Sequence, residues 1–149
     1  MGAEIFPLFS ELAAQASEIL GYSIEELCLG EQSDRLGQTQ FTQPALYAVC
    51  AMEYLSVSEG GAKPPDFAAG HSVGEYAALF AAGVFNFTDG LRLVQKRGEL
   101  MSKVEGGAMA AVIGMSPGAI TEAMQACGQD DVDLVNFNSP AQIVISGPA

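Results

Sequence analysis

Residues 70–74 read Gly-His-Ser-Val-Gly, and they follow the apolar residues 67–69 and precede a helix-like run. A serine hydroxyl becomes a useful nucleophile when a tight strand-to-helix turn exposes it beside backbone N–H groups. Glycines at both ends suit such a turn, because side chains at Gly70 and Gly74 would crowd it. The pattern predicts a nucleophile elbow at Ser72 and acyl transfer through serine. The alternative for this pattern taken alone is an ordinary turn serine.

Length and composition favour a packed globular chain. With 149 residues, 49% hydrophobic content and a mean hydropathy of +0.24, the chain can bury a sizeable core. No apolar run approaches the roughly 20 residues needed to cross a bilayer, so we expect no membrane partner and a cytoplasmic location. The net charge of −12 argues against a nucleic acid partner.

The cysteines and the histidine offer little for a metal site. Cys28, Cys50 and Cys127 are widely spaced and odd in number, and His71 is the one histidine in the sequence. Free thiols buried as small apolar side chains are the expected state of the cysteines. We therefore predict no bound metal.

The hydrophobic periodicity predicts an order of elements that mixes helices and strands. Helices are expected over 6–20, 24–27, from a cap at Thr42, over 75–82, from a cap at Thr88 to about 103, and over 117–127. Strands are expected at Phe67 and over 109–113, 132–137 and 142–146, and loops over 30–40 and 58–65.

Arg97 stands out by its position on the helix that Thr88 is expected to cap. At 100° per residue it falls inside the apolar arc, between Leu93 and Val94. Arginine is almost never buried unless it is paired, so a carboxylate should meet it. That carboxylate could be structural, such as Glu75, or it could belong to a ligand.

Four of the six cationic residues fall within twelve positions: Arg92, Lys96, Arg97 and Lys103. They could form a solvated helix face or a local site for anions.

His71 directly precedes the candidate nucleophile. Consecutive side chains on a strand-to-turn segment diverge, so His71 is not expected to take the proton from Ser72. It is expected to line the pocket in a supporting role.

Four segments carry a resemblance to a known family. They are residues 40–46, 70–76, 95–101 and 135–140. In this order and spacing they resemble the malonyl-CoA:acyl carrier protein transacylases and the acyltransferase domains of polyketide synthases. The resemblance runs across essentially the whole chain.

The resemblance implies an α/β fold with an α/β-hydrolase-like large subdomain over 1–105. An incomplete ferredoxin-like small subdomain would follow over 106–149. The family's opening strand and its catalytic histidine have no counterpart in this sequence. We therefore expect an interior fragment of the family domain, inactive when purified alone.

The same resemblance implies an acyltransferase of fatty acid or polyketide biosynthesis, and it implies a role for each candidate site residue. Ser72 would be the nucleophile, and Arg97, 25 residues later, would grip the free carboxylate of a malonyl group. The N–H of Val73 would donate to the oxyanion. Gln43 would form hydrogen bonds around the site, although helix packing accounts for it equally well. The implied partners are malonyl-CoA and an acyl carrier protein, with coenzyme A thioester as substrate and no cofactor.

Two other functions remain open on the sequence. A serine hydrolase such as a thioesterase or lipase shares the elbow, although it needs no cation on the acyl side of the pocket. A non-catalytic fragment or docking module is the second alternative.

Overall fold

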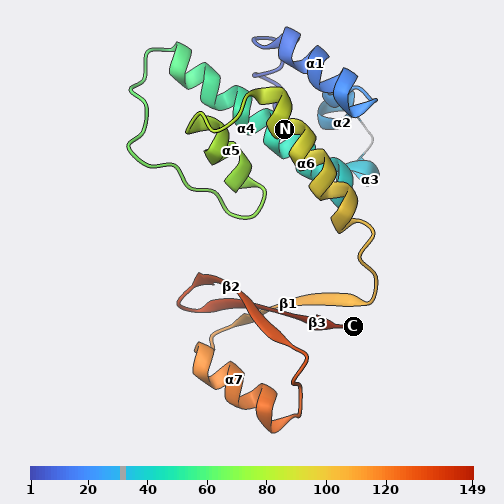
Figure 1. Ribbon diagram of the computed structural model, residues 1–149, viewed down its shortest axis with the longest axis vertical. Coiled ribbons are helices and arrows are strands. Elements are labelled where there is room, and N and C mark those ends of the chain that lie inside the picture. Colours follow the sequence, from blue (N-terminus) through green and yellow to red (C-terminus); the bar gives the residue numbers. More distant parts are fainter. Residues whose placement is uncertain (31–32) are drawn as a thin grey trace. The chain divides into compact units, whose positions relative to one another are not determined.

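The computed structural model describes residues 1–30 and 33–149, and it contains both helices and a sheet (Figure 1). The described chain divides into two compact units, Met1–Lys103 and Val104–Ala149. The mixed helix-and-sheet content agrees with the predicted α/β class.

The first unit consists of six helices in its described part (Figure 1). They are α1 (Ser10–Leu20), α2 (Ile24–Leu29), α3 (Ser33–Leu36), α4 (Thr39–Glu59), α5 (Gly74–Ala81) and α6 (Phe87–Met101). The long helix α4 packs against both α5 and α6. Gly21 ends α1 with a φ of 78°, a conformation that glycine adopts without steric cost.

Aromatic side chains fasten α4 to the start of α6. Tyr47 on α4 is buried, and its ring stacks on Phe87 with 5.9 Å between the ring centroids. The Tyr47 hydroxyl donates a hydrogen bond of 3.1 Å to the Phe87 carbonyl oxygen. Burial raises the pKa of Tyr47 well above its ordinary value, so the hydroxyl keeps the proton that it donates.

Both predicted threonine caps are wrong, because other residues begin these helices. The residue before α4 is Gln38, and Thr42 lies inside the helix, where its hydroxyl donates to the Gln38 carbonyl at 3.0 Å. Asn86 caps α6 by accepting from the Asp89 N–H at 2.9 Å. Asparagine is a stronger N-cap than threonine, which explains why the helix begins before Thr88.

The loops and the first helix also differ from expectation. The segment expected to loop over 30–40 contains α3 and the start of α4, and its residues 31–32 lie outside the described part. Helix α1 begins at Ser10, and residues 3–9 before it form turns. At the C-terminal end, α4 extends to Glu59, into the stretch expected as a loop.

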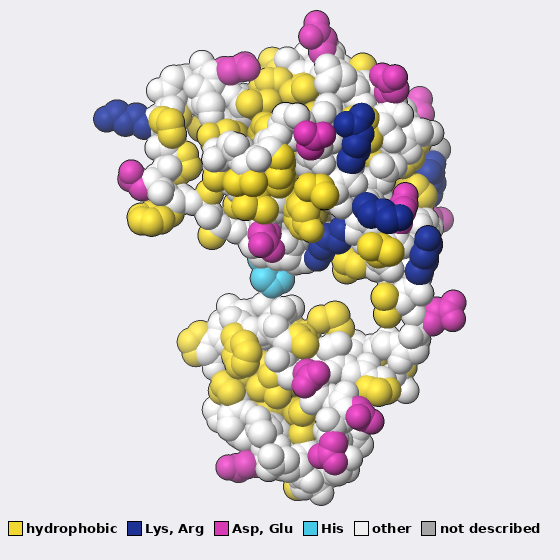
Figure 2. Space-filling model, viewed as in Figure 1, with side chains coloured by type: hydrophobic (Ala, Val, Ile, Leu, Met, Phe, Trp, Pro, Cys, Tyr) yellow, Lys and Arg dark blue, Asp and Glu magenta, His cyan; other side chains and the backbone are white. Residues whose placement is uncertain are grey.

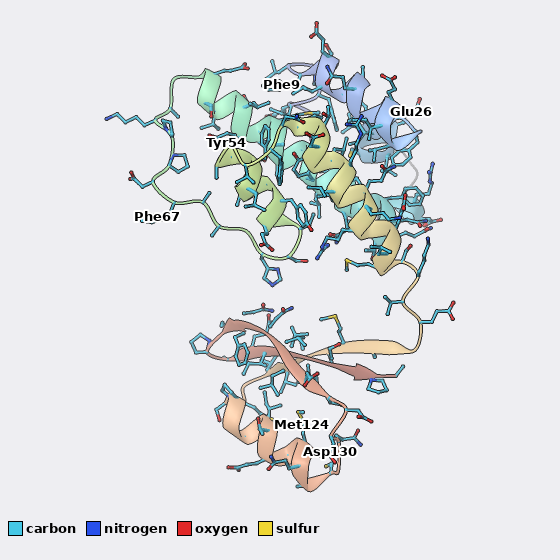
Figure 3. The ribbon with its side chains drawn as sticks, viewed as in Figure 1. Phe9, Glu26, Tyr54, Phe67, Met124 and Asp130 are labelled. Atoms are coloured by element: carbon cyan, nitrogen blue, oxygen red, sulfur yellow. The ribbon has the colours of Figure 1, made fainter. Side chains whose placement is uncertain are left out.

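The strand expected at Phe67 does not form. The segment from 62 to 70 has neither helix nor strand, and Phe67 is 93% exposed on the outer side of its loop (Figure 3). A strand is stabilised by pairing with another strand, and the described residues of the first unit contain none. The apolar sequence of this segment is therefore left without a partner within these residues.

The second unit is a three-stranded antiparallel sheet with one helix (Figure 1). Its elements are β1 (Gly107–Ile113), α7 (Pro117–Ala126), β2 (Asp133–Ser139) and β3 (Gln142–Pro148). Strand β3 lies between the other two, in the order β1-β3-β2. The Ser116 side chain caps α7 by accepting from the Ala119 N–H. These elements confirm the predicted strands and helix to within a few residues.

The cysteines only partly match expectation. Cys28 is buried, whereas Cys50 and Cys127 are exposed. The last two thus correct the prediction of buried thiols: Cys50 lies on an exposed side of α4, and Cys127 is the exposed residue that follows the end of α7. In the part of the chain that the structure covers, no helix is long and apolar enough to cross a membrane.

Candidate functional site

Ser72 lies at the tip of a tight turn that leads into α5. Its φ is +53°, and among the described residues no other non-glycine has a positive φ. The His71 carbonyl accepts from Gly74 N–H at 2.9 Å, and the Ser72 carbonyl accepts from Glu75 N–H at 3.2 Å. Serine in this conformation costs on the order of 1–3 kcal/mol. In a nucleophile elbow the strained turn holds the serine side chain out from the backbone. Ser72 is exposed, as this geometry requires.

The two glycines of the turn are not equivalent. A Cβ atom at position 70 would lie 2.0 Å from the Gly74 carbonyl carbon and oxygen, so glycine is the one amino acid that fits at this position. A Cβ atom at Gly74 would meet nothing within 4 Å. The expectation that both positions require glycine is thus correct for Gly70 and wrong for Gly74. Gly74 is the first residue of α5, and a side chain added there would enter open space within the described chain.

We expect Gly70→Ala to disrupt the turn and Gly74→Ala to preserve it. The backbone overlap at position 70 must displace Ser72, and a displacement of about 1 Å at a reacting group can cost about 100-fold in rate. Acyl loading of Ser72 in the full-length protein, with a melting curve for each variant, measures both effects. Equal loading by the two variants would contradict the role given to Gly70.

The residue after the serine offers a backbone donor. Val73 precedes the first residue of α5, and its N–H donates to no group of the described residues. Its side chain is 8% exposed and belongs to the core of the first unit. Val73 can therefore meet a substrate through its N–H, at the positive end of a helix.

Arg97 brings three predicted site residues together. Its Nη2 donates to Ser72 Oγ at 3.0 Å, and its Nη1 donates to Gln43 Oε1. Ser72 comes from the turn, Gln43 from α4 and Arg97 from α6. Sequence reasoning gave helix packing as an equal account of Gln43 and missed this contact. No local pattern links two positions 54 residues apart.

The expected carboxylate partner of Arg97 is absent from the described residues. Arg97 forms no ion pair there, and its partners are the neutral oxygens of Gln43 and Ser72. The structural alternative, an ion pair with Glu75, does not occur among the described residues, and Arg97 is only half-buried, so water can solvate its charge. The apolar arc is also narrower than predicted, because Leu93 and Leu100 are 50% and 55% exposed.

This geometry leaves the guanidinium ready for an anion. It carries five N–H donors, of which Gln43 and Ser72 engage two. The remaining donors can bind a planar carboxylate through two parallel hydrogen bonds. The positive charge lies within hydrogen-bonding distance of the candidate nucleophile.

The other cations of α6 behave as a solvated helix face. Arg92 pairs with Asp89 at 3.6 Å and Lys96 pairs with Glu99 at 3.4 Å, all with exposed side chains. Lys and Arg side chains gather over the region of α6 in Figure 2.

His71 is exposed, and its supporting role in the pocket stays a prediction.

Comparison with known proteins places the chain in a family. The acyl transferase domain family matches residues 9–149. A malonyl CoA-acyl carrier protein transacylase of polyketide biosynthesis from Bacillus subtilis, PksC, is 54% identical over 147 residues, covering 99% of this chain and 51% of that protein.

Two solved structures are also similar. A malonyl CoA-acyl carrier protein transacylase from Burkholderia pseudomallei matches with a TM-score of 0.96 and 50% identity, covering 100% of this chain and 51% of that one. The malonyl-transacylase PlMCAT, solved with AntF, a type II polyketide synthase acyl-carrier protein, matches with a TM-score of 0.90 and 41% identity, covering 99% of this chain and 50% of that one. The chain thus spans about half the length of these proteins. It belongs to the acyl transferase domain family.

Proposed function

We propose that the protein carrying this chain moves a malonyl group from coenzyme A to Ser72 and then to the thiol of an acyl carrier protein. One observation carries the proposal: Arg97 has no carboxylate partner among the described residues and donates to Ser72 Oγ at 3.0 Å. A cation at this place suits an acyl group that itself ends in a carboxylate. The similar transacylases, which are named for malonyl-CoA and the carrier protein, support the same substrates.

The reaction would proceed in two transfers through one covalent intermediate. Ser72 Oγ attacks the thioester carbonyl, and its proton passes to a general base, which the family resemblance identifies as a histidine elsewhere in the domain. The Val73 N–H donates to the oxyanion, and the thiolate of coenzyme A leaves with a proton. The thiol of the carrier protein then attacks the serine ester, which releases Ser72 and leaves malonyl on the carrier.

During both transfers, Arg97 would hold the distal carboxylate of the acyl group. Gln43 accepts from Nη1 and so limits how the guanidinium can turn. The interaction selects acyl groups that end in a carboxylate and orients the thioester carbonyl toward Ser72.

We also propose the finer architecture that the resemblance implies. The first unit would be the larger part of an α/β-hydrolase-like subdomain, and the second would begin a ferredoxin-like one. The boundary between Lys103 and Val104 and the strand-helix-strand-strand order of the second unit support this assignment.

A loading assay on the full-length protein tests the proposed function. Radiolabelled malonyl-CoA should label the protein in the absence of a carrier, and the label should pass to an added carrier protein that bears its phosphopantetheine thiol. Acetyl-CoA should label the protein far more slowly. Rapid release of free acid without transfer to the carrier would instead identify a serine hydrolase, the alternative that shares the elbow.

A further inference from the structure

We propose that Gly98 is a positioning residue that sets the acyl selectivity of the site. By letting α6 touch the backbone of α4, it places the Arg97 guanidinium against Ser72 and Gln43. The inference rests on the proposed function and assigns a cause to its selectivity.

Gly98 lies where two helices meet backbone to backbone. It is buried in α6, and a Cβ atom there would lie 3.2 Å from Gln40 Cα and 3.3 Å from the Thr39 carbonyl oxygen. These atoms belong to the main chain of α4, so they cannot rotate away as a side-chain end would. Even the Cβ atom of an alanine here therefore requires the two backbones to separate by a few tenths of an ångström.

Backbone conformation does not explain the glycine. Gly98 has no positive φ and lies inside a 15-residue helix. Alanine in a helix interior is more favourable than glycine by about 1 kcal/mol. The close approach of α4 is the feature of the structure that accounts for glycine here.

The contact lies beside the residues that hold the guanidinium. Gly98 follows Arg97 directly, while Gln40 and Gln43 lie three residues apart on one face of α4. Widening the helix spacing at Gln40 therefore moves Arg97 away from Gln43. Hydrogen bonds weaken steeply as their distance and angle depart from ideal values. A shift of α6 would therefore weaken the hydrogen bond between Arg97 and Gln43. It would displace Ser72 less, because Ser72 lies on a different segment.

The first turn of α4 is itself held in place by Thr42. Its hydroxyl lies against the carbonyl oxygens of Leu36 and Gln38, the latter at 3.0 Å. Thr42 thus ties the segment that carries Gln43 to the preceding turn, and it offers a second way to loosen the same contact without adding an atom between the helices.

Gly98→Ala in the full-length protein tests the inference through selectivity. The ratio of kcat/KM for malonyl-CoA to that for acetyl-CoA should fall at least tenfold, because acetyl has no carboxylate for Arg97 to hold. The control Leu91→Ala removes a fully buried side chain from the same helix. It should lower Tm and leave the ratio within about twofold.

A double-mutant cycle shows whether Gly98 acts through Arg97. In an Arg97→Ala background, Gly98→Ala should change the ratio no further. An unchanged ratio in the single variant, or an equal fall in both backgrounds, would overturn the inference. So would a fall in the ratio for Leu91→Ala as large as that for Gly98→Ala.

Thr42→Val serves if Gly98→Ala does not fold. It should lower the ratio at least threefold, and an unchanged ratio would count against the inference. A wild-type protein that does not prefer malonyl-CoA would refute the proposed function itself. A wild-type preference that both Gly98→Ala and Thr42→Val leave intact would refute only the role of Gly98.

Discussion

Replacing Ser72 with alanine in the full-length protein is expected to abolish transfer to the carrier protein, with a rate loss of about four to six orders of magnitude. The reason is that the proposed intermediate is an ester on this hydroxyl. Labelling with radioactive malonyl-CoA, followed by gel analysis, measures the intermediate directly. No stable label should remain on the variant.

Ser72→Gly separates the chemistry from the backbone strain. Glycine accepts the φ of +53° without steric cost. This variant should therefore be as inactive as Ser72→Ala and more stable than the wild type by about 1 kcal/mol. Transfer within tenfold of the wild-type rate in either variant would show that another group is the nucleophile.

Arg97→Ala is expected to lower kcat/KM for malonyl-CoA by the equivalent of about 2–5 kcal/mol, the usual effect of truncating one member of a buried, hydrogen-bonded charge pair such as the bound acyl group would form with Arg97. Acetyl-CoA lacks the carboxylate, so its use should fall far less or even rise. The measurement is kcat/KM for both thioesters, together with a melting curve for the variant. Only selective loss of malonyl use supports the proposed recognition.

Arg92→Ala provides the matched control. Arg92 lies on the same helix, with an exposed side chain paired to Asp89 at 3.6 Å. Its removal should change stability and both activities little, because exposed ion pairs contribute about 0–1 kcal/mol. If Arg97→Ala lowers kcat/KM for both thioesters equally and also lowers Tm, Arg97 has a structural role and does not recognise the acyl group.

Local patterns predicted most elements but not all of their ends. The periodicity located the main helices and the strands of the second unit, because burial on one face leaves a repeat in the sequence. It assigned the start of α6 to Thr88, whereas Asn86 two residues earlier makes the cap. At Phe67 the sequence has a strand-like composition, yet a strand also depends on a neighbour that no local pattern reveals.

The sequence predicted the residues of the candidate site one by one and not their arrangement. The turn pattern predicted Ser72, and the helical projection singled out Arg97. The contact of Arg97 with Gln43 joins positions 54 residues apart, so it depends on how α4 and α6 pack. The same packing explains Gly98, whose neighbours Thr39 and Gln40 lie far away in the sequence.

The left-handed backbone at Ser72 also restricts which nucleophile this turn can carry. Threonine offers the same hydroxyl, but its branched Cβ makes a positive φ a genuine outlier. Asparagine and aspartate tolerate a φ of +53° better, but an amide or a carboxylate is not the alcohol that this chemistry uses. Serine is the smallest residue that brings an alcohol to such a turn. The choice of hydroxyl amino acid at position 72 is therefore decided by the main chain as much as by the proposed reaction.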